Sequence, residues 1–198
     1  MLGSISPVGE AARNQRWWLT ATAHVLASAA AGALLGVLLG VAGAVTVGRF
    51  ATPLRLALLG LVLAIAAMTD GATRGSGPPS WRRQVNERWL TTYRGWVYGA
   101  GFGAQLGVGI ATIITSAATY ATLAAAVLAG SWRGGLAIGA GFGAARALPL
   151  LAMVGVDAAD RLYAVTRRVA HAEPLAHRLT VGGQGALAAI AVATAISA

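Results

Sequence analysis

Apolar residues in this sequence form long runs, separated by short connectors that contain Arg, Asp, Gly and Pro. A helix needs about 20 mainly apolar residues to cross the hydrocarbon core of a membrane. The pattern therefore predicts an all-α, polytopic integral membrane bundle of about six transmembrane helices, forming one domain over residues 19–198. A five-span bundle is the alternative if the region 95–132 contains a re-entrant segment. The expected spans are residues 19–47, 54–69, 95–114, 117–131, 134–156 and 179–198.

Three polar or amphipathic segments are expected to lie outside the hydrocarbon core. Residues 1–18 are polar, and we expect them to be loosely ordered or to lie at the surface. Aromatic and apolar residues recur every four positions along residues 81–94, which predicts an amphipathic helix on the membrane surface. A docking surface for a partner protein is the alternative for this helix. A second surface helix is expected around residues 162–169, before Pro174. The interfacial anchors of the helix at 81–94 would be Trp81, Trp89 and Tyr93.

Composition narrows the class of protein. Apolar residues make up 57 % of the chain and charged residues 11 %, which is typical of membrane proteins. All 15 basic residues are Arg. They lie mostly in the connectors, where they would meet lipid headgroups, so nucleic acid is not expected as a partner. The lipid bilayer is the expected surrounding, in the inner membrane of a bacterium.

The residues that carry catalysis or bind metals are scarce. The chain has no Cys, which excludes thiolate metal sites and thiol redox chemistry by this chain alone. His24 is expected to bond to a neighbouring helix, and His171 and His177 lack the spacing of metal ligands. No nucleophile and base, and no pair of carboxylates, share one depth in the membrane. We therefore expect no metal, no cofactor and no enzymatic activity.

The hexapeptide GAGFGA occurs twice, at residues 99–104 and 139–144. In each copy the first and third glycines are four residues apart and fall on one helix face, which allows another helix to approach closely. The expected packing positions are Gly99, Gly103, Gly139 and Gly143. If one span separates the copies, their helices run in the same direction. A second interpretation is that the two identical hexapeptides belong to an internal repeat.

Arg146 follows the second copy and falls where the membrane interior is expected. A guanidinium there is costly, so its counter-charge would be an anionic ligand, a helix C-terminus or a partner subunit. Snorkelling around a helix break at Pro149 is the alternative. Gln105 could face the same cavity. A polar cluster that marks a turn or helix break supplies further candidates for a solute pathway, namely Thr112, Thr115, Ser116 and Thr119.

Residues 99–151 resemble the transmembrane domain of the CcdA/DsbD family, whose members act in cytochrome c maturation and reductant transfer within a superfamily of small-solute exporters. The resemblance rests on the Gly/Phe-rich start of a span, the polar break, the short helix ending at Ser131, and the restart at Arg133. It implies a bundle with a broken-helix cavity. The family's Pro-Cys pair would fall near residues 113–115, where this sequence has neither residue, so the family's redox relay is not expected.

Two functional hypotheses follow from the sequence. The first is a small-solute transporter or permease-like protein, in which Arg146 attracts an anion. The second is a non-catalytic membrane subunit, anchor or assembly factor that packs against other membrane subunits. A homo-oligomer is a further possible arrangement. The absence of an acidic residue at the depth of Arg146 is compatible with both hypotheses.

Overall fold

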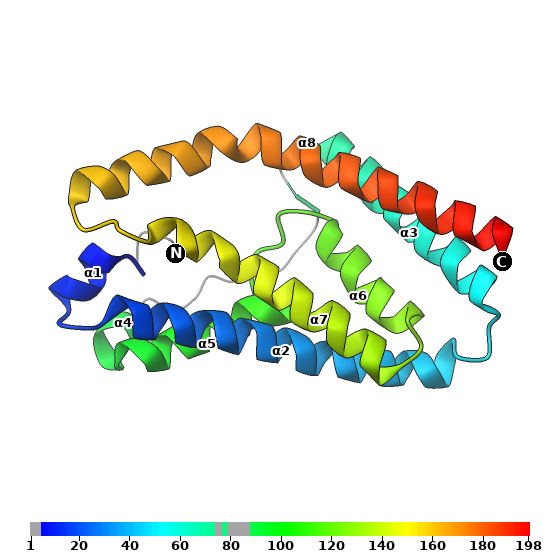
Figure 1. Cartoon of the computed structure of the whole chain (residues 1–198), viewed down its shortest axis with the longest axis horizontal. Helices are drawn as coiled ribbons and strands as arrows, with labels where there is room; N and C mark the ends of the chain where they lie inside the picture. Colours follow the sequence, from blue (N-terminus) through cyan, green and yellow to red (C-terminus); the bar gives the residue numbers. More distant parts are fainter. Residues whose placement is uncertain (1–4, 74–76, 79–87) are drawn as a thin grey trace.

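The computed structural model describes residues 5–73, 77–78 and 88–198, and its regular elements are all helical (Figure 1). The described part of the chain contains no β-strand, which confirms the all-α prediction. The elements are α1 (Pro7–Ala12), α2 (Trp17–Thr46), α3 (Thr52–Thr73), α4 (Trp89–Thr92), α5 (Gly95–Val108), α6 (Ala118–Leu128), α7 (Trp132–Ala147), the 3-10 helix η1 (Leu148–Met153) and α8 (Ala159–Ser197).

Four helices are long and apolar enough to cross a membrane: α2, α3, α7 together with η1, and α8. Large side chains on α2 point outward, since Leu26, Leu34 and Leu38 are all at least 60 % exposed. An apolar exterior of this kind suits lipid as the solvent. Helix α5 has 14 residues and α6 has 11, and each is shorter than the about 20 needed to cross alone. The structure therefore does not contain the two separate spans expected at 95–114 and 117–131.

Helix α2 packs against α5, α6 and α7, and mostly small residues line the face that it turns toward them. Helix α5 lies along the first half of this face. Gly99 meets the backbone of Thr20, and Gly107 meets that of Ser28, so α5 runs parallel to α2. Helix α6 continues in that direction, because its Val127 lies against Gly43 near the end of α2.

Helix α7 covers the second half of the same face in the opposite direction. Gly135 lies against Gly36, and Gly139 lies against Gly32. At each contact an added Cβ would overlap the facing carbonyl oxygen, so only glycine permits this approach. The close-packing glycines are Gly32, Gly36 and Gly40 on α2 and Gly135, Gly139 and Gly143 on α7.

The expectation that the two GAGFGA helices run in the same direction is wrong. It assumed that residues 95–131 cross the bundle twice. Instead α5 and α6 pass along α2 once, so the next helix, α7, must return antiparallel to both. The two copies therefore face α2 in opposite directions, and the third glycine of the second copy, Gly143, reaches the same residue of α2, Ser28, as Gly107 beyond the first copy.

Helices α3 and α8 form a second layer beside α6 (Figure 1). Gly60 of α3 meets Ala188 and Val192 of α8. The expected span at 54–69 is longer than predicted, since α3 covers Thr52–Thr73.

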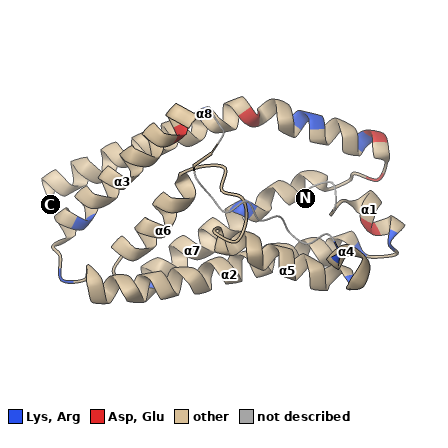
Figure 2. Cartoon of the chain, turned by 180° about the vertical axis from the view of Figure 1, so that it is seen from behind, with Lys and Arg blue, Asp and Glu red and all other residues tan. Residues whose placement is uncertain are grey.

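Helix α8 is continuous over Ala159–Ser197, so the expectation of a separate surface helix before Pro174 is wrong. A proline inside a helix removes one backbone hydrogen bond and usually kinks or breaks the helix. Here the helix continues through it. The first half of α8 is exposed, and Figure 2 shows that charged residues lie mainly on this half and at the ends of the other helices.

The N-terminal segment is ordered where the structure describes it, contrary to the prediction for residues 1–18. Ser6 caps α1 by accepting a hydrogen bond from the Gly9 amide (3.2 Å). Ile5 is buried with Tyr98 and Phe102 in an apolar cluster at the beginning of α2. This part of the chain folds onto the bundle because Ile5 fills that cluster and Glu10 finds buried partners.

The interfacial helix expected at 81–94 lies largely outside the described residues, and so does Trp81. Only the short helix α4 is described, and its Trp89 stacks on Phe102 of α5 with ring centroids 5.9 Å apart. Trp89 also fills the space beside Gly101. Tyr93 is half exposed and meets the edge of Trp89. Trp89 therefore packs on protein.

Candidate functional site at the interruption between α5 and α6

The chain is not helical between Val108 and Ala118, and this interruption lies near the middle of α2. Gly109 ends α5 with a φ of 79°, a left-handed conformation that favours glycine. A Cβ at Gly109 would also lie 2.8 Å from the ring of Phe142. The interruption leaves helix ends whose backbone groups need partners inside a membrane.

Arg146 belongs to α7, and its side chain lies beside the C-terminal end of α5. Its Nη2 donates a hydrogen bond to Thr112 Oγ1 (3.0 Å). The Thr112 hydroxyl in turn donates to the Gly109 carbonyl oxygen over a longer distance of 3.5 Å. The guanidinium also stands over the ring of Phe142, 5.4 Å from its centroid. No described acidic side chain forms an ion pair with Arg146. The guanidinium thus reaches the C-terminal end of α5 through Thr112, and the negative end of a helix dipole is the expected counter-charge that lies nearest to this arrangement.

Asp70 lies at the opposite helix end, the N-terminus of α6. Its carboxylate accepts hydrogen bonds from the Ser116 hydroxyl (2.6 Å), the Ala117 amide (2.7 Å) and Gln184 Nε2 (3.0 Å). Asp70 is only 2 % exposed. A carboxylate at a helix N-terminus complements the positive end of the dipole. The two ends of the interruption thus each have a buried or half-buried charge of the favourable sign.

This role of Asp70 was not predicted from the sequence, where the expected span ends at residue 69. The available signal was the apolar run itself: Asp70 lies within the 22 residues of α3 and not beyond its end. An acidic residue inside an apolar helix is a functional or structural candidate by default. Its partner Gln184 is 114 residues away, which no local pattern reveals.

A pocket of about 160 Å³ adjoins Arg146. Its wall is mainly apolar and includes Leu106 and Pro149. His24 also lines it, and its Nδ1 is buried without a hydrogen-bond partner among the described residues. Small-molecule sites usually measure about 300–1,000 Å³, so this pocket suits only a solute of a few atoms. The described residues that line it are Ile5, His24, Leu106, Arg146, Ala147, Pro149 and Leu150.

The structure places the other residues expected along a solute pathway on different sides of the interruption. Gln105 is half-buried and does not line the pocket, whereas its neighbour Leu106 does. Ser116 binds Asp70, and its carbonyl accepts from the amide of Thr119, which is buried. Thr115 is exposed. Arg146, Thr112 and Pro149 therefore gather on the α5 side of the interruption, while Ser116 belongs to the α6 side.

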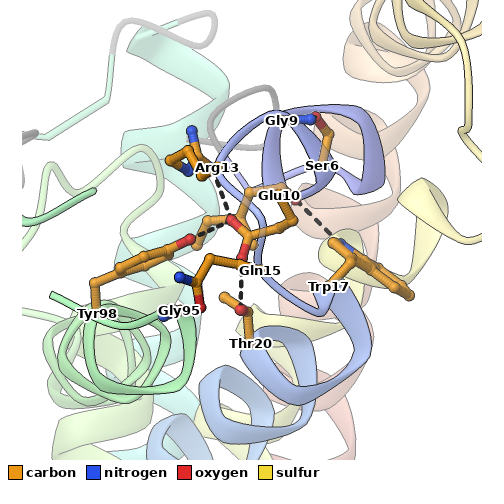
Figure 3. A network of polar contacts seen from close by, with 10 residues as sticks. Ser6, Gly9, Glu10, Arg13, Gln15, Trp17, Thr20, Gly95 and Tyr98 are labelled. Atoms are coloured by element: carbon orange, nitrogen blue, oxygen red, sulfur yellow. Dashed lines mark hydrogen bonds and ion pairs between the residues drawn. The ribbon is translucent and has the colours of Figure 1, made fainter. Parts of the chain in front are cut away.

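Glu10 forms a third buried charge centre, at the beginning of α2 (Figure 3). It is fully buried and accepts hydrogen bonds from Arg13 Nη2 (2.6 Å), Thr20 Oγ1 (2.7 Å) and the Tyr98 hydroxyl. Burial lowers the pKa of Arg13, but its hydrogen bonds to Glu10 and Tyr98 outweigh burial and raise that pKa. The network fixes α1 on α2 and α5, and thereby holds Ile5 in the wall of the pocket. The sequence did not reveal this network, because Glu10 lies in a polar segment.

The described residues contain no group of three or more His, Asp or Glu side chains placed to hold a metal ion. Beside the pocket at Arg146, the polar groups are a guanidinium, an imidazole and the Thr112 hydroxyl. Such groups can bind an anion through hydrogen bonds and charge.

Comparison with known proteins gives one informative similarity. No family model matches the chain, and no solved structure matches it. The chain is similar to the methylamine utilization protein MauF of Paracoccus versutus, with 34 % identity over 149 residues. These residues are 74 % of this chain and 54 % of MauF, so the chain spans about half the length of that relative.

Proposed function

We propose that this chain is a multi-pass protein of a bacterial inner membrane that moves a small anion along the interrupted segment α5–α6. One observation carries the proposal: Arg146 is half-buried at the interruption, beside a small pocket, and no described acidic residue pairs with it. A helix dipole compensates part of a charge, whereas an anionic solute would compensate the rest.

The interrupted segment is long enough to act as a fifth, discontinuous span. It follows α2 from Thr20 to Gly43, a length of about 35 Å at the rise of an α-helix, against about 30 Å for the hydrocarbon core. Discontinuous spans place helix ends at the middle of the membrane, which is where many transporters bind their solutes. The six-span count of the sequence analysis is thus replaced, in this proposal, by five.

Charge and size select the solute. Arg146 attracts anions and repels small cations such as methylammonium. The pocket of about 160 Å³ has room for only a few heavy atoms, and its wall is mainly apolar. A small monocarboxylate such as formate or acetate meets both conditions, because its oxygens suit the guanidinium and its remaining atoms suit the wall.

The resemblance to the CcdA/DsbD family supports the same arrangement. The interruption contains residues 113–115, the position where that family's Pro-Cys pair would fall. We propose that this chain shares a broken-helix bundle with the family and uses it without thiol chemistry.

Transport by the purified full chain in liposomes tests the proposal. We expect uptake of radiolabelled formate or acetate to fall to the level of empty liposomes in Arg146→Ala. Arg133→Ala is the matched control, because Arg133 lies on the same helix but is exposed and stands over Trp132. This control should transport like the wild type. Equal uptake by the wild type and Arg146→Ala would contradict the proposed anion transport.

A second candidate is a non-catalytic membrane component that serves methylamine utilization together with partner proteins. The similarity to MauF favours it, and so does the exposed first half of α8, which leaves room for a partner. Gentle extraction followed by mass spectrometry separates the candidates. A persistent complex with another protein, without anion uptake by the chain alone, favours this second function; uptake by the purified chain favours the first.

A further inference from the structure

We propose that the end of the bundle where α2 and α5 begin faces the cytoplasm and binds anionic phospholipid headgroups. The two helices run parallel, and the Gly95 amide donates a hydrogen bond to Gln15 Oε1 (3.0 Å), so their first turns lie side by side (Figure 3). Arg16 and Arg94 directly precede the two helices. The fold therefore brings two arginines that are far apart in the sequence to one level of the bundle.

Exposed indole rings mark the same level. Trp18 follows Arg16 by two residues and is 57 % exposed. Trp96 follows Arg94 by two residues and is 54 % exposed. Trp side chains are enriched where the headgroups meet the hydrocarbon core of a membrane. Each of the two parallel helices thus begins with an arginine and an interfacial tryptophan.

A second pair of this kind lies at the opposite end. Trp132 and Arg133 are exposed at the start of α7, next to Gly40 of α2, because Gly40 meets the carbonyl of Ser131. From Trp18 to Gly40, α2 rises by about 33 Å, close to the about 30 Å of a hydrocarbon core. The two pairs therefore mark the two surfaces of the membrane.

Arginine is distributed unequally between these two ends. On the side where α2 begins, the sequence has two Arg before α2, five between α3 and α5, and four within residues 161–178 of α8. The opposite side has three, namely Arg49, Arg55 and Arg133. Arginines beside membrane spans concentrate on the cytoplasmic side. Eleven against three predicts that the end with Arg16 and Arg94 is cytoplasmic and that α8 ends on the far side.

The single passage of α5 and α6 along α2 decides this distribution. If residues 95–131 crossed the membrane twice, Arg133 and the four Arg of α8 would change sides, and the distribution would be eight against six. That difference is too small to orient the chain. The inference rests on the five-pass path of the proposed function but not on its solute, so a failure of anion transport leaves it standing.

The side chains of Arg16 and Arg94 are available to a ligand. Both are exposed, and neither has a hydrogen bond or ion pair with another side chain in the described part of the chain. Arg55, by contrast, donates to the Ala129 carbonyl (3.4 Å). The cytoplasmic leaflet carries anionic lipids that attract arginines near its surface, and a guanidinium suits the phosphate of a headgroup.

Single cysteines test the orientation, because the chain has none of its own. Ala12→Cys marks the end of α1 and Ser197→Cys the end of α8, both at exposed positions. We expect a membrane-impermeant maleimide added to spheroplasts to label Ser197→Cys, and to label Ala12→Cys only after the membrane is permeabilised. The reverse pattern overturns the cytoplasmic assignment. Labelling of both cysteines from one side overturns the five-pass path on which the assignment rests.

Native mass spectrometry of the full chain tests the headgroup contact, with nanodiscs of equal phosphatidylglycerol and phosphatidylcholine as the probe. Arg16→Gln/Arg94→Gln should lower the enrichment of retained phosphatidylglycerol by about fivefold for each arginine. Arg16→Lys/Arg94→Lys keeps the charges and should keep most of the enrichment.

The matched control is Arg133→Gln/Arg161→Gln, which removes two charges that already have partners, Trp132 and Asp157. It should retain phosphatidylglycerol like the wild type. Equal enrichment in the wild type and Arg16→Gln/Arg94→Gln overturns the headgroup contact, and so does an equal loss in the two glutamine variants. A loss in both the glutamine and the lysine variants at positions 16 and 94 overturns it as well, because charge would then not be the cause.

Discussion

Gly32 and Gly139 face each other with their backbones in contact, and neither position has room for a side chain. A Cβ on Gly139 would overlap the Gly32 carbonyl and lie 2.9 Å from the Cα of Gly36. Two residues along the same helix, Gly141 faces open space. The same hexapeptide thus contains two glycines that packing requires, Gly139 and Gly143, and one that it does not.

We expect Gly139→Ala to destabilise the protein by about 1–3 kcal/mol, because backbone must move to admit the methyl group. Gly141→Ala should be neutral, or stabilising by up to about 1 kcal/mol through helix propensity. Reversible unfolding in mixed micelles, followed by circular dichroism, compares the two. Equal effects of the two substitutions would show that α2 and α7 do not pack as described.

Asp70→Asn should loosen the beginning of α6. The substitution removes the negative charge and turns an acceptor into a partial donor toward Ser116 and the Ala117 amide, at a cost of about 1.5–3 kcal/mol. Hydrogen exchange of peptides covering residues 115–120 should accelerate about tenfold or more. Asp157→Asn serves as control, because its carboxylate is exposed and pairs only with Arg161 at the surface. Unchanged exchange in Asp70→Asn would contradict the capping role.

Glu10→Gln should detach α1 from the bundle. Glu10 is fully buried and accepts from Arg13, Thr20 and Tyr98, so loss of its charge should cost about 1.5–3 kcal/mol. Limited proteolysis should then cut the region around α1 faster than in the wild type. The exposed Glu173 on α8 provides the comparison, since Glu173→Gln should change nothing. Similar digestion of both variants would mean that the network does not hold α1.

Much of the fold follows from local patterns. The apolar runs predict helices, and the spacing of Gly32, Gly36 and Gly40 by four residues predicts a face that another helix approaches closely. These features depend on neighbouring residues, which a sequence displays directly. The break around Thr112 also has a local cause, since a run of polar and β-branched residues interrupts the helix-forming residues on either side.

Relations between distant residues did not follow from the sequence. Whether residues 95–131 cross the bundle once or twice depends on the contacts of α6 with α2, and this choice reversed the expected direction of α7. The partners of Asp70 and Glu10 lie up to 114 residues away. Pro174 suggested a helix end, yet α8 continues through it. Tertiary contacts decided each case against the local expectation.

The site was found only in part for the same reason. Arg146 was identifiable, because a charge in an apolar run is costly wherever it packs. Its contact with Thr112 joins residues that are 34 positions apart, and His24 enters the pocket from a third helix. Gln105 was a reasonable candidate by position, but the pocket takes the side chain of the next residue, Leu106.

The absence of cysteine in the chain permits the most direct test of an anion site beside the interruption. Leu106→Cys places a single thiol in the pocket wall, and Leu26→Cys places one on the exposed apolar face of α2. We expect a small water-soluble thiol reagent to modify the first cysteine, and formate to slow that reaction saturably. In the Arg146→Ala background the protection by formate should vanish, and the second cysteine should be insensitive to formate in both backgrounds. A reaction rate at Leu106→Cys that formate does not change while Arg146 is present would contradict the account.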